Sequence, residues 1–304
     1  MKVLVSGGTG LVGRYIVQEL DARGYAVTVG GRHAPPLHLF PPRVAFTPLT
    51  LDPETDQTEI FHDIDAFVHA AFSHVPGKYR GGEGTDPAGF RRLNLDGTVA
   101  LFEAARHAGV RRCVFLSSRA VYGDPAGTAL LRETAKTAPE TLYGQVKRDA
   151  ERALLSLGDA DFVPTVLRAT GVYGDLRPNK WDGLFADYLA GRPVPARAGT
   201  EVHGCDLAHA VRLMLTAPPD AVAGEVFNVS DIATDTRAIL RPLQEATGSP
   251  HPLLPASRHT LTGEMDTAKL RALGWSGGGL PLLEETVRRL AATMPPAGAA
   301  QSSA

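Results

Sequence analysis

The chain opens with a short apolar run, a cluster of glycines and then a helical pattern. Val3–Val5 are consecutive apolar residues without polar alternation, which suits a strand buried on both faces of a parallel sheet. Glycines follow over positions 7–13, and apolar residues then recur at helical spacing from Leu11 to Leu20. This order predicts a strand, a glycine turn and a helix at the start of the fold.

Strand-like and helical patterns alternate through the first half of the chain. Helices are predicted over Phe90–Ala108 and from Pro139 to Leu157, the latter because proline suits the first position of a helix. This alternation predicts an α/β fold, a doubly wound parallel sheet of the Rossmann type with helices on both faces. Further strands are expected at Tyr25–Val29, Val44–Leu49, Ile64–Ala71, Arg112–Leu116 and Phe162–Leu167.

The pattern changes beyond Arg168, where helical segments are separated by proline and glycine loops. We therefore predict a dinucleotide-binding domain over residues 1–168 and a smaller, mostly helical substrate-binding lobe over residues 169–294. Part of this lobe, around residues 204–230, is a candidate to return to the sheet. Residues 295–304 have nothing to bury, and we expect a disordered tail there.

Composition and charge narrow the class of protein. The 304 residues are 43% hydrophobic and carry a formal net charge of −2, which gives no electrostatic case for a nucleic acid or a membrane surface. No apolar run approaches membrane-spanning length, and the start of the chain has no signal-peptide pattern. Cys113 and Cys205 are too few for a disulfide framework, and Cys/His spacing typical of metal sites is absent. We expect a cytoplasmic protein without a metal that acts on a small-molecule substrate.

The glycine cluster has the spacing G-x-x-G-x-x-G, between a predicted strand and a predicted helix. One glycine allows the tight turn, another lets the backbone approach a pyrophosphate, and the third lets the helix pack close to the strand. The N-terminus of the helix would face the phosphates with unpaired N–H groups and a favourable dipole. The cofactor contacts predicted in this loop are Gly7, Thr9, Gly10, Leu11, Val12 and Gly13.

Tyr143 and Lys147, in the segment YGQVK, are candidates for proton transfer. Four residues apart on a helix, they share one face, and an ammonium near a phenol lowers the phenol pKa from its usual value near 10. Such a tyrosine can donate a proton to a carbonyl or take one from an alcohol. Ser118 ends a predicted strand, where ligand sites of open α/β sheets lie, and could bind the same substrate oxygen. Taken alone, the pair also fits an amphipathic helix with a surface lysine.

Several segments together resemble the extended branch of the short-chain dehydrogenase/reductase superfamily, the NAD-dependent epimerase/dehydratase family. Besides the glycine motif and YGQVK, they are VFLSSRAVYG around Ser118, HAA at His69–Ala71, NLDGT at Asn94–Thr98 and LRATGVYG at Leu167–Gly174. The resemblance covers about residues 1 to 230. It implies a nicotinamide cofactor and, because members often dimerise through helices beside the sheet, a homodimer.

The resemblance also assigns roles to residues. It implies Ser118, Tyr143 and Lys147 as the catalytic set, with Lys147 also on the nicotinamide ribose. The cofactor contacts implied outside the glycine loop are Asp52 near the adenine, Ala70, Ala71, Asn94, Tyr143 and Lys147.

The end of the second predicted strand bears on the choice of cofactor. NAD enzymes usually have an acid there, about 20 residues beyond the glycines, that binds the ribose 2′-OH. Here Gly31 takes that position and Arg32 follows. Because no carboxylate repels a 2′-phosphate and a guanidinium is available to bind one, we predict NADP in preference to NAD.

Three departures from the family pattern limit the reaction. Arg119 and Ala120 stand where dehydratases carry an Asp-Glu pair, which disfavours dehydration. Gly171 stands where nucleotide-sugar epimerases typically have an asparagine. Gly199 stands at the position of an arginine that holds the substrate diphosphate, although Arg197 is near. These departures disfavour a nucleotide-diphosphate sugar and leave a free sugar or sugar acid open as the substrate.

We predict an NAD(P)-dependent oxidoreductase that transfers hydride between the nicotinamide and a hydroxyl or carbonyl carbon of a small polar, sugar-like substrate. A sugar epimerase that retains NAD(P) is the alternative, since it would use the same residues. A non-catalytic dinucleotide sensor is the second alternative, although such relatives often lack the tyrosine or lysine. Candidate pocket residues, each equally expected as packing or surface residues, are His74, Lys78, Tyr79, Arg80, Tyr173, Trp181 and His203.

Overall fold

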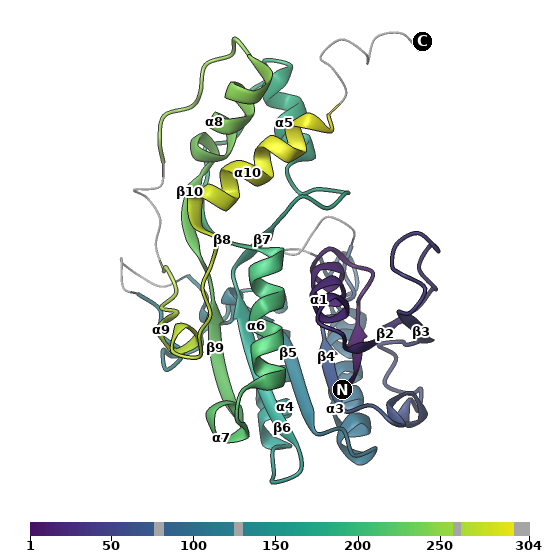
Figure 1. The fold of residues 1–304 in the computed structure, drawn as a ribbon. Coiled ribbons are helices and arrows are strands. Elements are labelled where there is room, and N and C mark those ends of the chain that lie inside the picture. Colours follow the sequence, from purple (N-terminus) through teal and green to yellow (C-terminus); the bar gives the residue numbers. More distant parts are fainter. Residues whose placement is uncertain (76–81, 125–129, 258–262, 295–304) are drawn as a thin grey trace.

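A seven-stranded sheet in the order β3-β2-β1-β4-β5-β6-β9 forms the larger part of the molecule (Figure 1). The computed structural model describes residues 1–75, 82–124, 130–257 and 263–294. Each neighbouring pair in the sheet is parallel, which confirms the predicted Rossmann fold. The strands are β1 (Lys2–Ser6), β2 (Ala26–Gly31), β3 (Ala45–Pro48), β4 (Ala66–His69), β5 (Arg112–Ser118), β6 (Val163–Ala169) and β9 (Glu225–Val229).

Helices cover both faces of this sheet. On one face α1 (Leu11–Ala22) packs against α6 (Gly204–Thr216), and the other face carries α3 (Gly97–His107) and α4 (Leu142–Ser156) (Figure 1). The apolar run at the start of the chain serves both layers, since Val3 and Val5 belong to the core beneath α1 and Leu4 to the core beneath α3. This two-sided burial explains why the strand has no polar alternation.

A second lobe stands at the end of the sheet where the strands finish (Figure 1). Its helices α5 (Asp182–Leu189), α8 (Thr236–Thr247) and α10 (Gly279–Ala292) share a core of their own. It also contains a three-stranded sheet in the order β10-β8-β7, which the sequence did not predict. These strands are β7 (Gly171–Tyr173), β8 (Ala198–His203) and β10 (Ile232–Asp235), and none of them contains a continuous run of large apolar residues.

Two helix boundaries differ from the predictions. The helix predicted from Pro139 begins at Leu142, because the Thr141 side chain caps it by accepting from the Gly144 N–H at 3.1 Å. The helix predicted over Phe90–Ala108 is divided by a π-helical turn, Arg92–Asp96, which lies between α2 (Pro87–Arg91) and α3. The remaining elements are α7 (Pro219–Val222), α9 (Ala268–Arg271) and 3₁₀ turns at Thr58–Phe61 and Arg119–Tyr122.

The structure does not test two of the predictions, those for the tail and for the domain boundary. The tail expected to be disordered, residues 295–304, lies outside the described residues. The boundary between the predicted domain of residues 1–168 and the lobe of residues 169–294 stays a prediction.

Within the described residues, none of the helices has the length and apolar character needed to span a bilayer.

The Tyr15 hydroxyl joins the first helix of the sheet domain to the second lobe. It donates to the Asp175 carboxylate at 2.9 Å and accepts from the backbone N–H groups of Asp175 and Leu176 at 2.8 and 3.1 Å. The Tyr15 residue is only 3% exposed, and burial raises the pKa of the hydroxyl, so it remains a donor. One buried side chain therefore fixes the segment that leads from β7 into the second lobe.

Replacing this hydroxyl tests its contribution to stability. We expect Tyr15→Phe to lower the free energy of unfolding by about 1–2 kcal/mol, because it leaves two partly buried N–H groups without their acceptor. Urea unfolding followed by circular dichroism measures the change. Tyr25→Phe, on the loop before β2, is the matched control, and equal midpoints for the two variants would contradict the assigned role.

Candidate active site

The glycine loop between β1 and α1 is tightly packed, and the N-terminus of α1 beside it has no side-chain cap. Both features suit a pyrophosphate site. A Cβ atom on Gly13 would lie 2.1 Å from the carbonyl oxygen of Gly7, so a larger residue cannot occupy this position without moving the turn. The N-cap residue of α1 is Gly10, and no side chain caps this helix. Its first N–H groups are therefore left for an anion, which is the property expected of a dinucleotide-binding loop.

His69 braces the backbone opposite the glycine loop. Its ring is fully buried and hydrogen bonds to the hydroxyls of Ser6 and Thr98 at 2.7 and 3.0 Å. The Ser6 hydroxyl also accepts from the Ala71 N–H at 3.3 Å, so the predicted cofactor contacts at Ala70 and Ala71 are held against β1. Burial, assisted by the positive charge of Lys147, lowers the pKa of His69 to about 3, so its ring is neutral at physiological pH.

Lys147 is buried at the end of the sheet. It is 5% exposed, and its Nζ donates to the Leu116 carbonyl oxygen at 2.7 Å. The ammonium also lies over the rings of Phe72 and Phe115, at 4.7 and 4.6 Å from their centroids. Burial lowers the pKa of Lys147 to about 7, while the charge of Glu151 acts in the opposite direction. The lysine is therefore poised to change charge near neutral pH.

The other two predicted catalytic residues flank this lysine. Tyr143, one turn earlier on α4, packs its ring edge-on against Phe72 with 5.1 Å between centroids. Ser118 ends β5, and its hydroxyl oxygen accepts from the Ala120 N–H at 3.2 Å. A Cβ on Gly144 would lie 2.5 Å from the Ala120 carbonyl oxygen, so the first turn of α4 is packed directly against the chain that follows Ser118. The three residues thus lie on elements that pack against each other, α4 and the end of β5.

Two of the predicted cofactor contacts already have protein partners. The Asn94 side chain accepts from the Ser73 N–H at 2.6 Å and donates to the Ser73 carbonyl at 2.7 Å, so it holds the loop after β4. Asp52, predicted near the adenine, pairs with Arg92 at 2.6 Å. Arg32 is exposed at the end of β2. The cofactor roles of these residues remain predictions.

The candidate pocket residues separate into two groups. Tyr173, Trp181 and His203 are all buried in the second lobe, where Tyr173 stacks on Trp181 with centroids 5.4 Å apart and meets His203 edge-on at 5.0 Å. This arrangement favours the packing role for these three rings. His74 lies against Phe72, with ring centroids 6.0 Å apart. The other proposed cover residues, Lys78, Tyr79 and Arg80, lie outside the described residues.

Two residues of this site escaped the sequence predictions. Phe72 directly follows the HAA segment and touches both Tyr143 and Lys147, yet its position alone gave no chemical signal. Glu151 lies one further turn along α4 and accepts a hydrogen bond from the Ser117 hydroxyl. Its spacing of four residues from Lys147 is the signal that could have revealed it.

Comparison with known proteins agrees with this geometry. A model of the NAD dependent epimerase/dehydratase family matches residues 3–230. UDP-glucose 4-epimerase from Streptomyces lividans is 28% identical over 90% of this chain and 91% of its own length. The chain therefore belongs to the NAD-dependent epimerase/dehydratase family, and the prediction of an NAD(P)-dependent enzyme of short-chain dehydrogenase type is confirmed.

Solved structures of similar proteins also support membership of this family. UDP-glucose 4-epimerase of Thermus thermophilus in complex with NAD is 27% identical, with a TM-score of 0.78 over 97% of this chain and 100% of that chain. MoeE5 in complex with UDP-glucose and NAD is also 27% identical, with a TM-score of 0.76 over 95% and 99% of the two chains. These relatives agree better with our alternative, an epimerase, than with our first hypothesis of a dehydrogenase or reductase. Because they contain NAD, they give no support to the predicted preference for NADP.

The burial of Lys147 gives a prediction for stability. We expect Lys147→Met to raise the free energy of unfolding by about 1–3 kcal/mol at pH 7, because a charged group that is costly to bury is removed. In the wild type the folded state releases the lysine proton at about pH 7, and the unfolded chain keeps it up to the ordinary value of 10.5. Wild-type stability therefore rises across this window, and the advantage of the variant should shrink as the pH approaches 10.5.

Urea unfolding at pH 7 and pH 10 measures both parts of this expectation. Lys136→Met, at an exposed position before α4, is the control and should change little at either pH. A Lys147→Met protein that is less stable than wild type at pH 7 would show that the ammonium is a net stabilising group.

Proposed function

We propose that the protein is a sugar epimerase that retains its nicotinamide cofactor and acts through Tyr143, Ser118 and Lys147. The observation that carries the proposal is the meeting of these three residues at the edge of the sheet beside an uncapped glycine loop. The similarity to UDP-glucose 4-epimerases supports inversion at a carbon, rather than net oxidation or reduction. We infer NAD as the resident cofactor, because the structures of the relatives contain it.

Tyr143 would act as the acid and base of the reaction. Its phenolate takes the proton of the substrate hydroxyl as the carbon is oxidised, and its phenol returns a proton to the same oxygen as the carbon is reduced. Lys147, one turn further along α4, stabilises the phenolate with its charge. Ser118 holds the reacting oxygen by a hydrogen bond. A bound nicotinamide would supply the hydride acceptor in the first half and the hydride donor in the second.

The resident cofactor would lie between the glycine loop and the braced segment Ala70–Ala71. The N–H groups at the start of α1 would bind its pyrophosphate, and Lys147 would hold the nicotinamide ribose. The ring of Phe72 covers both Tyr143 and the lysine, which limits the access of water to the proton-transfer site.

The second lobe bears on the class of sugar. A Cβ on Gly171 would lie 2.8 Å from a carboxylate oxygen of Glu201, which forms an ion pair with Lys180. With Gly171 and Gly199 at positions where we expect polar contacts to a nucleotide sugar, a carboxylate takes up part of this space. We therefore infer a sugar whose binding does not depend on a bound diphosphate.

The first experiment identifies the retained nucleotide and the reaction together. The purified protein is denatured, the released nucleotide is identified as NAD or NADP, and the native protein is incubated with UDP-glucose, UDP-glucuronic acid and the corresponding free sugars. Formation of an isomer without net consumption of added NAD(P)H supports the proposal. Stoichiometric oxidation or reduction would instead support the dehydrogenase hypothesis, and tight nucleotide binding without turnover would support the sensor.

Removal of the tyrosine hydroxyl tests the mechanism. Tyr143→Phe should lower turnover by about 10²–10⁴-fold, because the proton donor is lost, while affinity for the nucleotide changes little. Steady-state rates and fluorescence titration with NADH measure the two quantities. Tyr188→Phe is the matched control, since this hydroxyl donates to the His251 carbonyl in the second lobe at 2.6 Å. Full activity in Tyr143→Phe would remove the tyrosine from the mechanism.

A further inference from the structure

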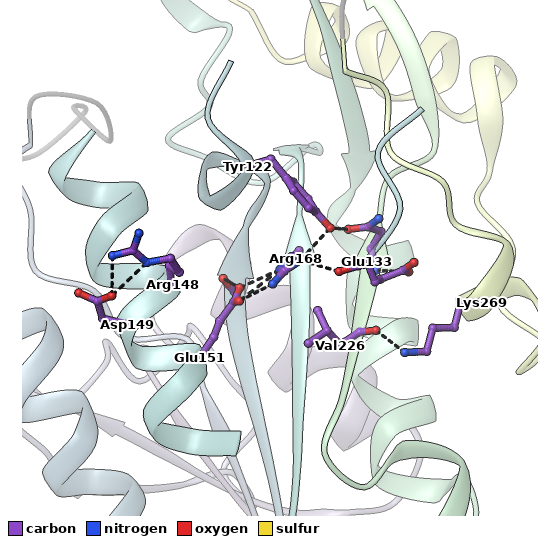
Figure 2. A network of polar contacts seen from close by, with 10 residues as sticks. Tyr122, Glu133, Arg148, Asp149, Glu151, Arg168, Val226 and Lys269 are labelled. Carbon is purple, nitrogen blue, oxygen red and sulfur yellow. Dashed lines mark hydrogen bonds and ion pairs between the residues drawn. The ribbon is translucent and has the colours of Figure 1, made fainter. Parts of the chain in front are cut away.

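A buried chain of polar residues runs beneath the end of β5, from α4 across β6 to β9 (Figure 2). Glu151 accepts from Arg168 through Nε and one terminal nitrogen, at 3.1 and 2.7 Å. Arg168 in turn donates to the Tyr122 hydroxyl at 2.9 Å, and this hydroxyl donates to Asn228 at 2.7 Å. The Glu151 and Arg168 side chains are 3% and 7% exposed. The proposed proton transfer uses none of these residues.

The chain of contacts ends on α4, at the face of the helix that carries Lys147. Lys147 and Glu151 are four residues apart and therefore share one face of the helix. They bind two successive residues of β5, since Lys147 donates to the Leu116 carbonyl and Glu151 accepts from the Ser117 hydroxyl. Ser118 is the next residue along the strand. The carboxylate thus helps to fix the helix against the part of β5 that presents the catalytic serine.

Glu151 is also the anion that acts on the buried lysine. Its charge opposes the effect of burial, which disfavours the charged lysine. Arg168 lies on the far side of the carboxylate and balances its charge. The other groups around Lys147 carry no negative charge, apart from any phenolate that forms on the neighbouring tyrosine. From the elements packed there, these groups are the neutral His69 on β4, the rings of Phe72 and Phe115, and Tyr143 on α4.

Stability alone is a weak reason for such an arrangement. Removing two charges from water costs several kcal/mol per ion, and a well-packed apolar pair of similar volume is often as stable. A buried ion pair one helical turn from Lys147, on the same face of α4, is therefore better explained by its effect on the placement of that lysine.

We propose that Glu151, anchored by Arg168, is a positioning residue that holds α4, and with it the Lys147 side chain, against the end of β5, beside Ser118. The kinetic part of this inference rests on the proposed function, whereas the charge of the lysine can be measured without a substrate.

The substrate-free measurement is the titration of Lys147 by NMR in protein labelled at the lysine side chains, with Lys147→Met identifying the signal. In Glu151→Gln we expect the pKa of Lys147 to fall by at least one unit. At pH values above the pKa, the fraction of Lys147 that is charged then falls about tenfold. Because Glu151→Gln leaves Arg168 buried without a counterion, the double variant Glu151→Gln/Arg168→Gln is measured beside it. It should also show a lower lysine pKa, by a smaller amount.

The kinetic measurement follows from the same shift. If the pKa of the lysine moves from about 7 to about 6, turnover by Glu151→Gln should fall by about twofold at pH 6 and about tenfold at pH 8. Glu19→Gln is the matched control, because Glu19 pairs with Arg212 at 2.8 Å in a partly buried contact between α1 and α6. This control should retain the wild-type pH profile.

The outcomes separate the two proposals. A lowered pKa for Lys147 without any epimerisation in wild type would support the positioning role and count against the proposed function. An unchanged pKa in both glutamine variants would overturn the positioning role, as would a loss of activity that is equal at pH 6 and pH 8. Either result would leave Glu151 as a purely structural partner of Arg168.

Discussion

The arrangement of the site depends on the interactions of the Lys147 ammonium, which is buried where β5 ends. A charged lysine in an apolar environment is stable only if other groups offset its lost hydration. Here the Leu116 carbonyl, two aromatic rings and the nearby Glu151 carboxylate do so. Those contacts also bring α4 against β5, so the same interactions that tolerate the charge determine where Tyr143 and Ser118 lie.

The parallel sheet supplies the frame for this arrangement. Because all seven strands run the same way, the segments that follow β1, β4 and β5 emerge at one edge. The glycine loop, the braced Ala70–Ala71 segment and Ser118 therefore meet although they are far apart in sequence. His69 strengthens this frame as a neutral buried ring that ties β1 to α3 through Ser6 and Thr98.

Local patterns were enough to predict the sheet domain, since its buried strands and amphipathic helices give strong periodic signals. They also made Ser118, Tyr143 and Lys147 candidates, because a lysine one turn from a tyrosine is evident from spacing; their catalytic role stays a prediction. The strands of the second lobe were missed because β7 has only three residues, and β8 (AGTEVH) and β10 (IATD) mix small, polar and apolar residues without a continuous apolar run. The buried contacts between Arg168, Tyr122 and Asn228 depend on tertiary packing across sequence separations of 46 and 106 residues, which no local pattern reveals.

Under the proposed function, chemistry and substrate selection would be physically separate in this molecule. The proton-transfer residues belong to the sheet and α4, where burial and hydrogen bonds leave little freedom for substitution. The departures from the nucleotide-sugar pattern, Gly171 and Gly199, lie on β7 and β8 in the second lobe, and Glu201 follows Gly199 by two residues on β8. Exchanging side chains on these short strands changes the charge around a substrate without moving Tyr143 or Lys147. The fold can therefore keep one reaction while its choice of sugar changes.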